Sequence, residues 1–94
     1  EFFMSRCVSQ ALPIFRALAD ATRLRILQLV RRMELSVGEL AQVLGQSQPR
    51  VSRHVKILCD AGLLERRKEG SWVFVALGAP GAAASVAAAL DAWG

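Results

Sequence analysis

The stretch Ser47–Leu58, SQPRVSRHVKIL, has the pattern of a short amphipathic helix with one basic face. Ser47 can cap its first turn, and Pro49 suits that turn because a missing N–H there costs no intrahelical hydrogen bond. The apolar residues recur at i, i+4 and i+7, as one buried helix face requires: Val51, Val55 and Leu58. With Gly62 as the stop, the sequence predicts a helix over residues 48–61.

A second short helix precedes this one. Ser36 and Glu39 have the Ser-x-x-Glu spacing of a capping box and predict a helix over residues 37–44. Its expected inward residues are Leu40, Val43 and Leu44. Gly45 ends the helix, since glycine adopts the left-handed conformation easily. Two short helices joined by the turn at residues 45–47 predict a helix-turn-helix.

The segment after the second helix favours a β-hairpin. Residues 63–67 and 72–77 form two short runs, the second rich in aromatic and β-branched side chains. Residues 68–71 lie between them, and Gly70 supplies the positive φ of a tight turn. A helix-turn-helix followed by a basic hairpin, here the wing at residues 63–77, is the arrangement of a winged helix.

Three further helices complete the expected chain. Pro13 suits the first turn of a helix whose apolar residues are Ile14, Phe15 and Leu18, and an earlier turn or two within residues 5–12 is compatible with the sequence. Asp20 is placed to cap a helix over residues 21–32. The alanine-rich residues 82–93 predict a last helix.

We therefore predict one domain over residues 5–94, mainly α with a small β-hairpin (α+β), in the order α-α-α-α-β-β-α. We interpret residues 1–4 as a cloning remnant and the natural start, because Glu1-Phe2-Phe3 precedes Met4. Residues 71–90 carry no charge, but Gly78, Pro80 and Gly81 interrupt them and eight are alanine. We expect a strand and a helix there, and no membrane span.

Basic residues are concentrated in one part of the 94-residue chain. The whole chain has a net charge of +4, and residues 50–68, with six basic residues and two acids, carry that entire excess. A localised positive charge indicates a polyanionic partner, although a solvated basic face remains the alternative.

In a helix-turn-helix the second helix enters the DNA major groove and its N-terminal residues reach base edges. Arg can pair with guanine and Gln with adenine, and Lys56, further along, suits a phosphate. A helical wheel places most of the polar residues opposite Val51, with His54 at the border. The candidate contacts of the helix are Ser47, Gln48, Pro49, Arg50, Ser52, Arg53, His54 and Lys56, and those of the wing are Arg66, Arg67, Lys68 and Ser71.

Two segments resemble the ArsR/SmtB winged-helix repressors: ALADATRLRILQLV (17–30) and ELSVGELAQVLGQSQPRVSRHVKILCDAGLLERRKEGSWVFVAL (34–77). The resemblance implies a homodimeric transcriptional repressor that releases operator DNA, an inverted repeat, when an inducer binds. It also implies DNA contacts at Gln48, Ser52, Arg53 and His54 and a wing at residues 66–71.

The metal-sensing residues of that family are missing. Many members carry two cysteines in the motif Glu-Leu-Cys-Val-Cys-Asp-Leu, whereas this chain has Ser36 and Gly38 at those positions. Other members bind metals on the last helix, where Asp91 is the sole candidate ligand here. We therefore expect no metal site, no cofactor and an unidentified inducer. No constellation of catalytic residues is present, so we expect no enzymatic activity.

Cys7 and Cys59 lack any paired spacing, and we expect reduced thiols in a cytoplasmic protein, with Cys59 exposed. A thiol-based redox-sensing repressor remains an alternative. A second alternative is that the chain is the N-terminal DNA-binding or dimerisation module of a larger protein with a methyltransferase domain, which similar regulators carry.

The last helix has an apolar stripe that needs a partner. Val86, Leu90 and Trp93 share one face at i, i+4 and i+7 on a helix with a single charge. The four earlier helices and the hairpin already supply a small core. We therefore expect this stripe to form an isologous dimer interface together with Phe15 of the first helix.

Overall fold

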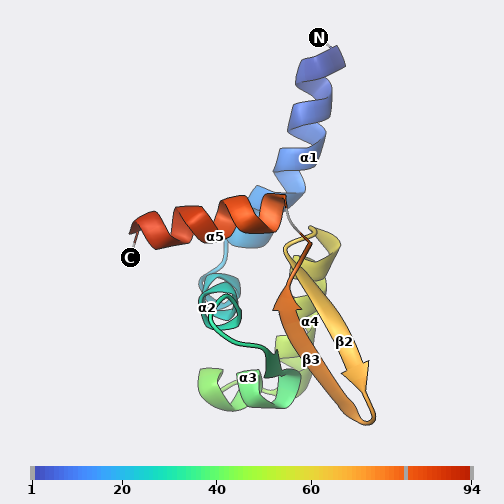
Figure 1. Cartoon of the computed structure of the whole chain (residues 1–94), viewed down its shortest axis with the longest axis vertical. Helices are drawn as coiled ribbons and strands as arrows, with labels where there is room; N and C mark the ends of the chain where they lie inside the picture. The colour runs from blue at the N-terminus through green and yellow to red at the C-terminus, as the bar shows by residue number, and fades with distance from the viewer. Residues whose placement is uncertain (1, 80, 94) are drawn as a thin grey trace.

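The computed structural model describes residues 2–79 and 81–93, and their side chains from Val8 onward. Its elements are α1 (Phe2–Leu18), α2 (Ala21–Val30), β1 (Leu35–Ser36), α3 (Val37–Leu44), α4 (Gln48–Asp60), β2 (Leu64–Glu69), β3 (Trp72–Leu77) and α5 (Ala82–Trp93). The fold has five helices and a small antiparallel sheet, and the β2–β3 hairpin projects beside α4 as a wing (Figure 1). The predicted winged helix-turn-helix is confirmed.

Short-range caps start the helices where the sequence predicts them. The Asp20 side chain accepts a hydrogen bond from the Arg23 amide at the start of α2. At α3, Ser36 and Glu39 form the complete capping box. Ser47 caps α4, so α3 and α4 begin at the expected residues.

Two helix limits differ from the prediction by more than one residue. The helix α1 begins at Phe2, and Pro13 lies inside it rather than in its first turn. Residues 2–12 contain neither glycine nor proline, so nothing in them stops a helix from continuing upstream. The helix α2 ends at Val30, two residues before the expected limit, and the Arg31 amide bonds back to Leu27 and Leu29.

The sheet has a strand that the sequence did not predict. β1 pairs antiparallel with β3 through Leu35↔Val75 and Ser36↔Phe74, so the strand order is β1-β3-β2. The hairpin is also longer than expected, because β2 continues to Glu69, which pairs with Trp72. Its turn is therefore Gly70-Ser71 alone, with Gly70 at φ 62°.

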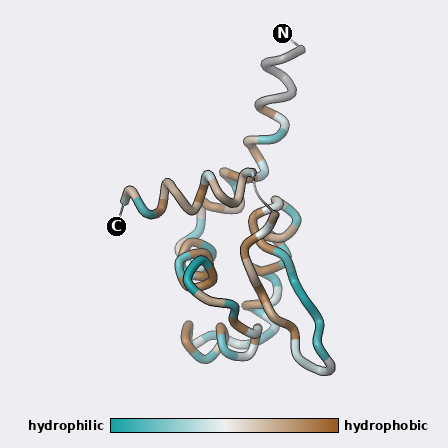
Figure 2. Tube along the Cα trace, in the orientation of Figure 1, coloured by the Kyte–Doolittle hydropathy of each residue, from teal (hydrophilic) through white to brown (hydrophobic). Residues whose placement is uncertain are grey.

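One hydrophobic core joins α2, α3, α4 and the sheet. The fully buried side chains include Ile26, Leu40, Val51, Val55, Leu58, Leu63 and Val75, so the predicted inner face of α4 is confirmed. The prediction for Val43 is wrong: it is 62% exposed, and Ala41 of α3 is buried instead. In Figure 2 the hydrophilic β2 lies beside the hydrophobic β3, which is the central strand of the sheet.

Within the described residues, none of the helices is long and apolar enough to cross a membrane.

Candidate nucleic-acid interface

The helix α4 presents the predicted polar face to solvent. Arg50, Arg53 and Lys56 are exposed, as are Ser47, Gln48 and Pro49 at its start, while Ser52 is half-buried at the edge. The opposite face packs into the core: its residues Val51, Val55 and Leu58 are fully buried. The helix is thus held rigidly while its basic side chains remain available to a ligand.

Only some of these cations lack a counter-charge. Lys56 forms an i, i+4 ion pair with Asp60, with Nζ 3.0 Å from Oδ2. Among the residues that the structure describes, neither Arg50 nor Arg53 lies within ion-pair distance of an acid. The N-terminal half of α4, where a helix-turn-helix reads bases, therefore carries the uncompensated charge.

The wing adds basic residues on the side that faces α4. Side chains alternate along a strand, so Arg66 and Lys68 share the face of buried Leu64. Arg66 lines a cleft of about 370 Å³ between α3, α4 and the hairpin. The other polar residues of the cleft include Gln48, Ser52 and Ser71, so predicted contacts from the helix and the wing do come together.

The structure does not support the predicted DNA contact of Arg67. Its side chain lies on the opposite face of the hairpin, where it pairs with both Glu34 and Glu69. Its guanidinium also stacks over the Phe74 ring, 5.2 Å from the centroid. The two carboxylates raise the pKa of Arg67 above its ordinary value. Glu34 lies 33 residues from Arg67 in sequence, so it is outside residues 50–68 and does not enter the net charge of that segment.

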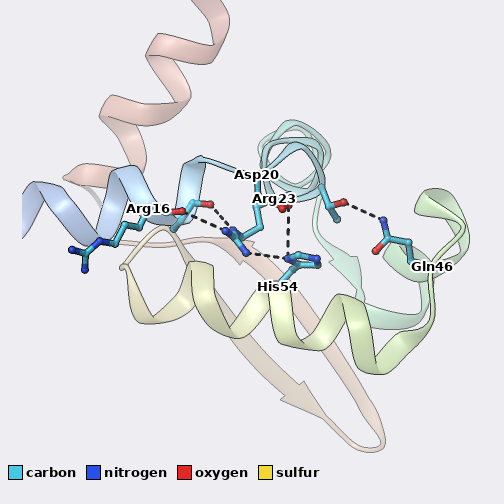
Figure 3. A network of polar contacts seen from close by, with 7 residues as sticks. Arg16, Asp20, Arg23, Gln46 and His54 are labelled. Atoms are coloured by element: carbon cyan, nitrogen blue, oxygen red, sulfur yellow. Dashed lines mark hydrogen bonds and ion pairs between the residues drawn. The ribbon is translucent and has the colours of Figure 1, made fainter.

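His54 is also directed differently from the expectation. Its side chain is 17% exposed, and Nδ1 lies 3.3 Å from Arg23 Nη1 and 3.9 Å from Asp20 Oδ2 (Figure 3). The ring thus contacts the start of α2, and its Nδ1 is engaged within the protein instead of facing solvent beside Arg53. No local pattern points to Arg23, because its partners lie 6 residues before it and 31 after it.

The structure places Cys59 in a less reactive position than the sequence suggested. The thiol is half-buried against the core, rather than exposed. Burial raises the pKa of the Cys59 thiol, and Arg66 nearby opposes that effect. The thiolate is the nucleophile and the redox-active form, so this position does not favour a redox switch. The side chain of Cys7 lies outside the described residues.

The carboxylate considered as a metal ligand has another partner. Asp91 of α5 pairs with Arg31, which follows α2. In the part of the chain whose side chains are described, no three His, Cys, Asp or Glu groups come together as a possible metal site. Ser36, at one position where the related motif has cysteine, is 2% exposed and caps α3.

The expected dimer residues divide into two groups. Phe15 and Trp93 are 66% and 81% exposed, and they line an apolar groove of about 450 Å³ between α1 and α5. Val86 is half-buried in the same groove. Leu90 also lines the groove, but it is only 7% exposed and belongs to the core of this chain, because α5 packs against α2.

Known proteins resemble this chain in sequence. The family model described as bacterial regulatory protein, arsR family, matches residues 20–66. The arsenical resistance operon repressor of Escherichia coli is 49% identical over a 69-residue alignment that covers 70% of this chain and 59% of the repressor. The transcriptional activator HlyU of Vibrio cholerae is 39% identical over 74 residues, covering 79% of this chain and 68% of the activator.

Solved structures agree with the fold. The homodimeric winged helix-turn-helix DNA-binding domain of Mb0332 from Mycobacterium bovis has a TM-score of 0.85 at 26% identity, covering 95% of this chain and 82% of that domain. HlyU from Vibrio cholerae has a TM-score of 0.77 at 36% identity, covering 86% of this chain and 88% of that one.

The match to the Escherichia coli repressor spans 59% of that protein, and the match to ArsR1 of Pseudomonas putida spans 51%. The chain thus covers little more than half of these relatives' length. The matched model and the identity to HlyU nevertheless extend over the helix-turn-helix and into the wing. This chain belongs to the arsR family of bacterial regulatory proteins.

Proposed function

We propose that this chain is a sequence-specific regulator of transcription that binds double-stranded operator DNA and acts in the cytoplasm, where the bacterial chromosome lies. The observation that carries the proposal is the exposed face of α4, on which Arg50 and Arg53 have no acidic partner among the described residues. An acid there would repel phosphates, whereas two unpaired guanidinium groups suit guanine edges. Arg66 and Lys68 extend this surface onto the wing.

The proposed active form is a homodimer on an inverted repeat. The exposed aromatic residues Phe15 and Trp93 border one apolar groove, which a second copy would cover across a two-fold axis. The related Mb0332 domain is described as homodimeric. A dimer also reads two half-sites, and one helix-turn-helix by itself contacts too few bases for tight specific binding.

We propose repression, relieved by an inducer that is not a metal ion. Ser36 serves the capping box and Gly38 has no side chain, so neither provides the soft thiolate that Cd²⁺ or As(III) prefers. Addition of Zn²⁺, Cd²⁺ or As(III) to a purified protein–operator complex is expected to leave the complex intact. Release of DNA at one metal equivalent per subunit would show that a metal site exists.

The test of DNA recognition starts with selection of bound duplexes from a random pool, followed by affinity measurements on the selected operator. Arg53→Ala should weaken operator binding by about 1–3 kcal/mol and relax the preference at one base step. Arg25→Ala removes an equal charge from the exposed side of α2 and should change the affinity little. An Arg53→Ala protein that binds and discriminates as the parent does would show that α4 does not read the bases in this way.

A further inference from the structure

The end of α1 is held by a side chain from α2. Arg23 Nε donates to the Ala17 carbonyl at 2.7 Å, and Nη2 donates to the Arg16 carbonyl at 3.3 Å. Both carbonyls belong to the last turn of α1, where helix carbonyls lack an i+4 amide within the helix, and the Arg16 carbonyl also accepts from the Ala19 amide at 3.3 Å. A cation at this position also interacts favourably with the helix dipole. Arg23 therefore ties the last turn of α1 to α2.

The same guanidinium reaches the recognition helix. Arg23 Nη1 lies 3.3 Å from Nδ1 of His54 in the second turn of α4. Arginine has only donors, so in this contact Nδ1 is the acceptor and the proton of a neutral ring lies on Nε2. The Asp20 carboxylate, 3.9 Å from the ring, is held by the Arg23 amide at 3.0 Å. One side chain thus connects three helices, as Figure 3 shows.

The joined helices carry two different surfaces. On α1, Phe15 lines the apolar groove. On α4, Arg53 lies on the exposed basic face, directly before His54 in the sequence. In a two-fold dimer the distance between the recognition helices depends on the angle between these two helices. A change in that angle would move both copies of α4 relative to the DNA half-sites.

We infer that Arg23 and His54 are positioning residues that set which half-site spacing the dimer accepts. The inference rests on the proposed function, because it requires a dimer on paired half-sites. It concerns the separation of the half-sites and not their base sequence, which the exposed residues of α4 read.

A second contact between α2 and the helix-turn-helix provides a matched control. Gln46 Nε2 donates to Thr22 Oγ1 at 3.1 Å and ties α2 to the turn before α4. This contact does not involve α1. Thr22→Val therefore removes another hydrogen bond between α2 and the helix-turn-helix, and it leaves the contacts of Arg23 with α1 and with His54 in place.

The experiment measures binding of the full chain to operators with identical half-sites and spacers varied in steps of one base pair. The parent should show one sharp optimum. His54→Leu and Arg23→Gln should each lose about tenfold in affinity at the optimum and less at other spacings, so that the profile flattens. Base preference within each half-site should stay unchanged, and thermal unfolding shows that each variant is folded at the assay temperature.

A conservative variant separates the hydrogen bond from packing. Asn carries a carbonyl oxygen at the same distance along the side chain as Nδ1 of His, so His54→Asn keeps an acceptor for Arg23. It should retain the sharp optimum, and Thr22→Val should retain it even with a lower melting temperature. Arg53→Ala should change base preference and keep the parent's spacing optimum.

The outcomes distinguish failure of this inference from failure of the proposed function. If His54→Leu and Arg23→Gln keep the sharp optimum, or if His54→Asn is as flat as His54→Leu, the inference is wrong while operator binding stands. If the parent binds no duplex, or binds single and paired half-sites equally, the proposed function fails and the inference fails with it.

Discussion

At the residue scale, Asp20 joins helix capping to the pH dependence of stability. The hydrogen bond from the Arg23 amide lowers the pKa of the Asp20 carboxyl below its ordinary value, and the charge of Arg23 contributes in the same direction. A carboxyl whose pKa is lowered by folding stabilises the folded state above its unfolded pKa, near pH 4. That contribution is lost as the pH falls through the lowered pKa.

We predict that Asp20→Ala lowers the free energy of unfolding by about 1 kcal/mol at pH 7. The difference from the parent should shrink as the pH falls below about 4, because protonation removes the same charge from the parent. Asp20→Asn keeps a capping oxygen without a charge, and it should lose less at pH 7. Denaturant unfolding of the three proteins from pH 3 to pH 7 is the measurement, and a constant gap between parent and Asp20→Ala would contradict this account.

At the scale of elements, the alternation of side chains along β2 divides three consecutive cations between two surfaces. Arg66 and Lys68 lie on the side of buried Leu64, whereas Arg67 lies on the other side with Glu34 and Glu69. A charge that is already paired twice within the protein adds little attraction for phosphates. Adjacent residues of the wing should therefore differ in their effect on DNA binding.

We predict that Lys68→Ala weakens binding to all duplexes alike and reduces the salt slope of the binding constant by about 0.9 per subunit, or about 1.8 for the proposed dimer, as the loss of one phosphate contact from each subunit requires. Arg67→Ala should leave that slope unchanged and alter affinity by less than about twofold, because its pairs are exposed and internal. Titrations at several salt concentrations test both variants together. If Arg67→Ala reduced the salt slope more than Lys68→Ala did, Arg67 and not Lys68 would be the residue that contacts phosphate, and the assignment of the two hairpin faces would be wrong.

At the scale of the whole molecule, the shape is more extended than one compact domain of this length. The radius of gyration is 13.7 Å, compared with about 12 Å for a compact chain of this size. Figure 1 shows the reason: α1 projects away from the body, with α5 running beside its base. The groove lined by Phe15 and Trp93 lies between these two helices, so the proposed second copy would have a site that the protomer does not fill.

We predict that Trp93→Ala raises the dimer dissociation constant roughly a hundredfold or more, because an isologous interface loses the side chain twice. Folding of the protomer should change by less than about 0.5 kcal/mol, since the Trp93 side chain is 81% exposed. Phe15→Glu should act in the same direction, and Met33→Ala, exposed elsewhere at 57%, is the control. Sedimentation would contradict this interface if the Trp93→Ala protein remained a dimer at the parent's concentrations.

The local elements were predictable because their determinants are close in sequence. The capping residues Asp20, Ser36 and Ser47 each bond to an amide three residues ahead, so their spacing is visible in the chain itself. The inner face of α4 follows from the helical period alone. The same two signals identified the helix-turn-helix and most of the exposed reading face.

The remaining features depend on contacts between residues far apart in sequence. β1 exists because Leu35 meets Val75 across the sheet, and two residues have no strand pattern of their own. The ion pair between Arg67 and Glu34 and the contact between His54 and Arg23 form only when the helices and the wing are packed together. A helical wheel assigns a side chain to a face, but it does not say which element covers that face. Periodicity and caps act within one or two turns, whereas the orientation of a charged side chain depends on the partner that the whole fold brings beside it.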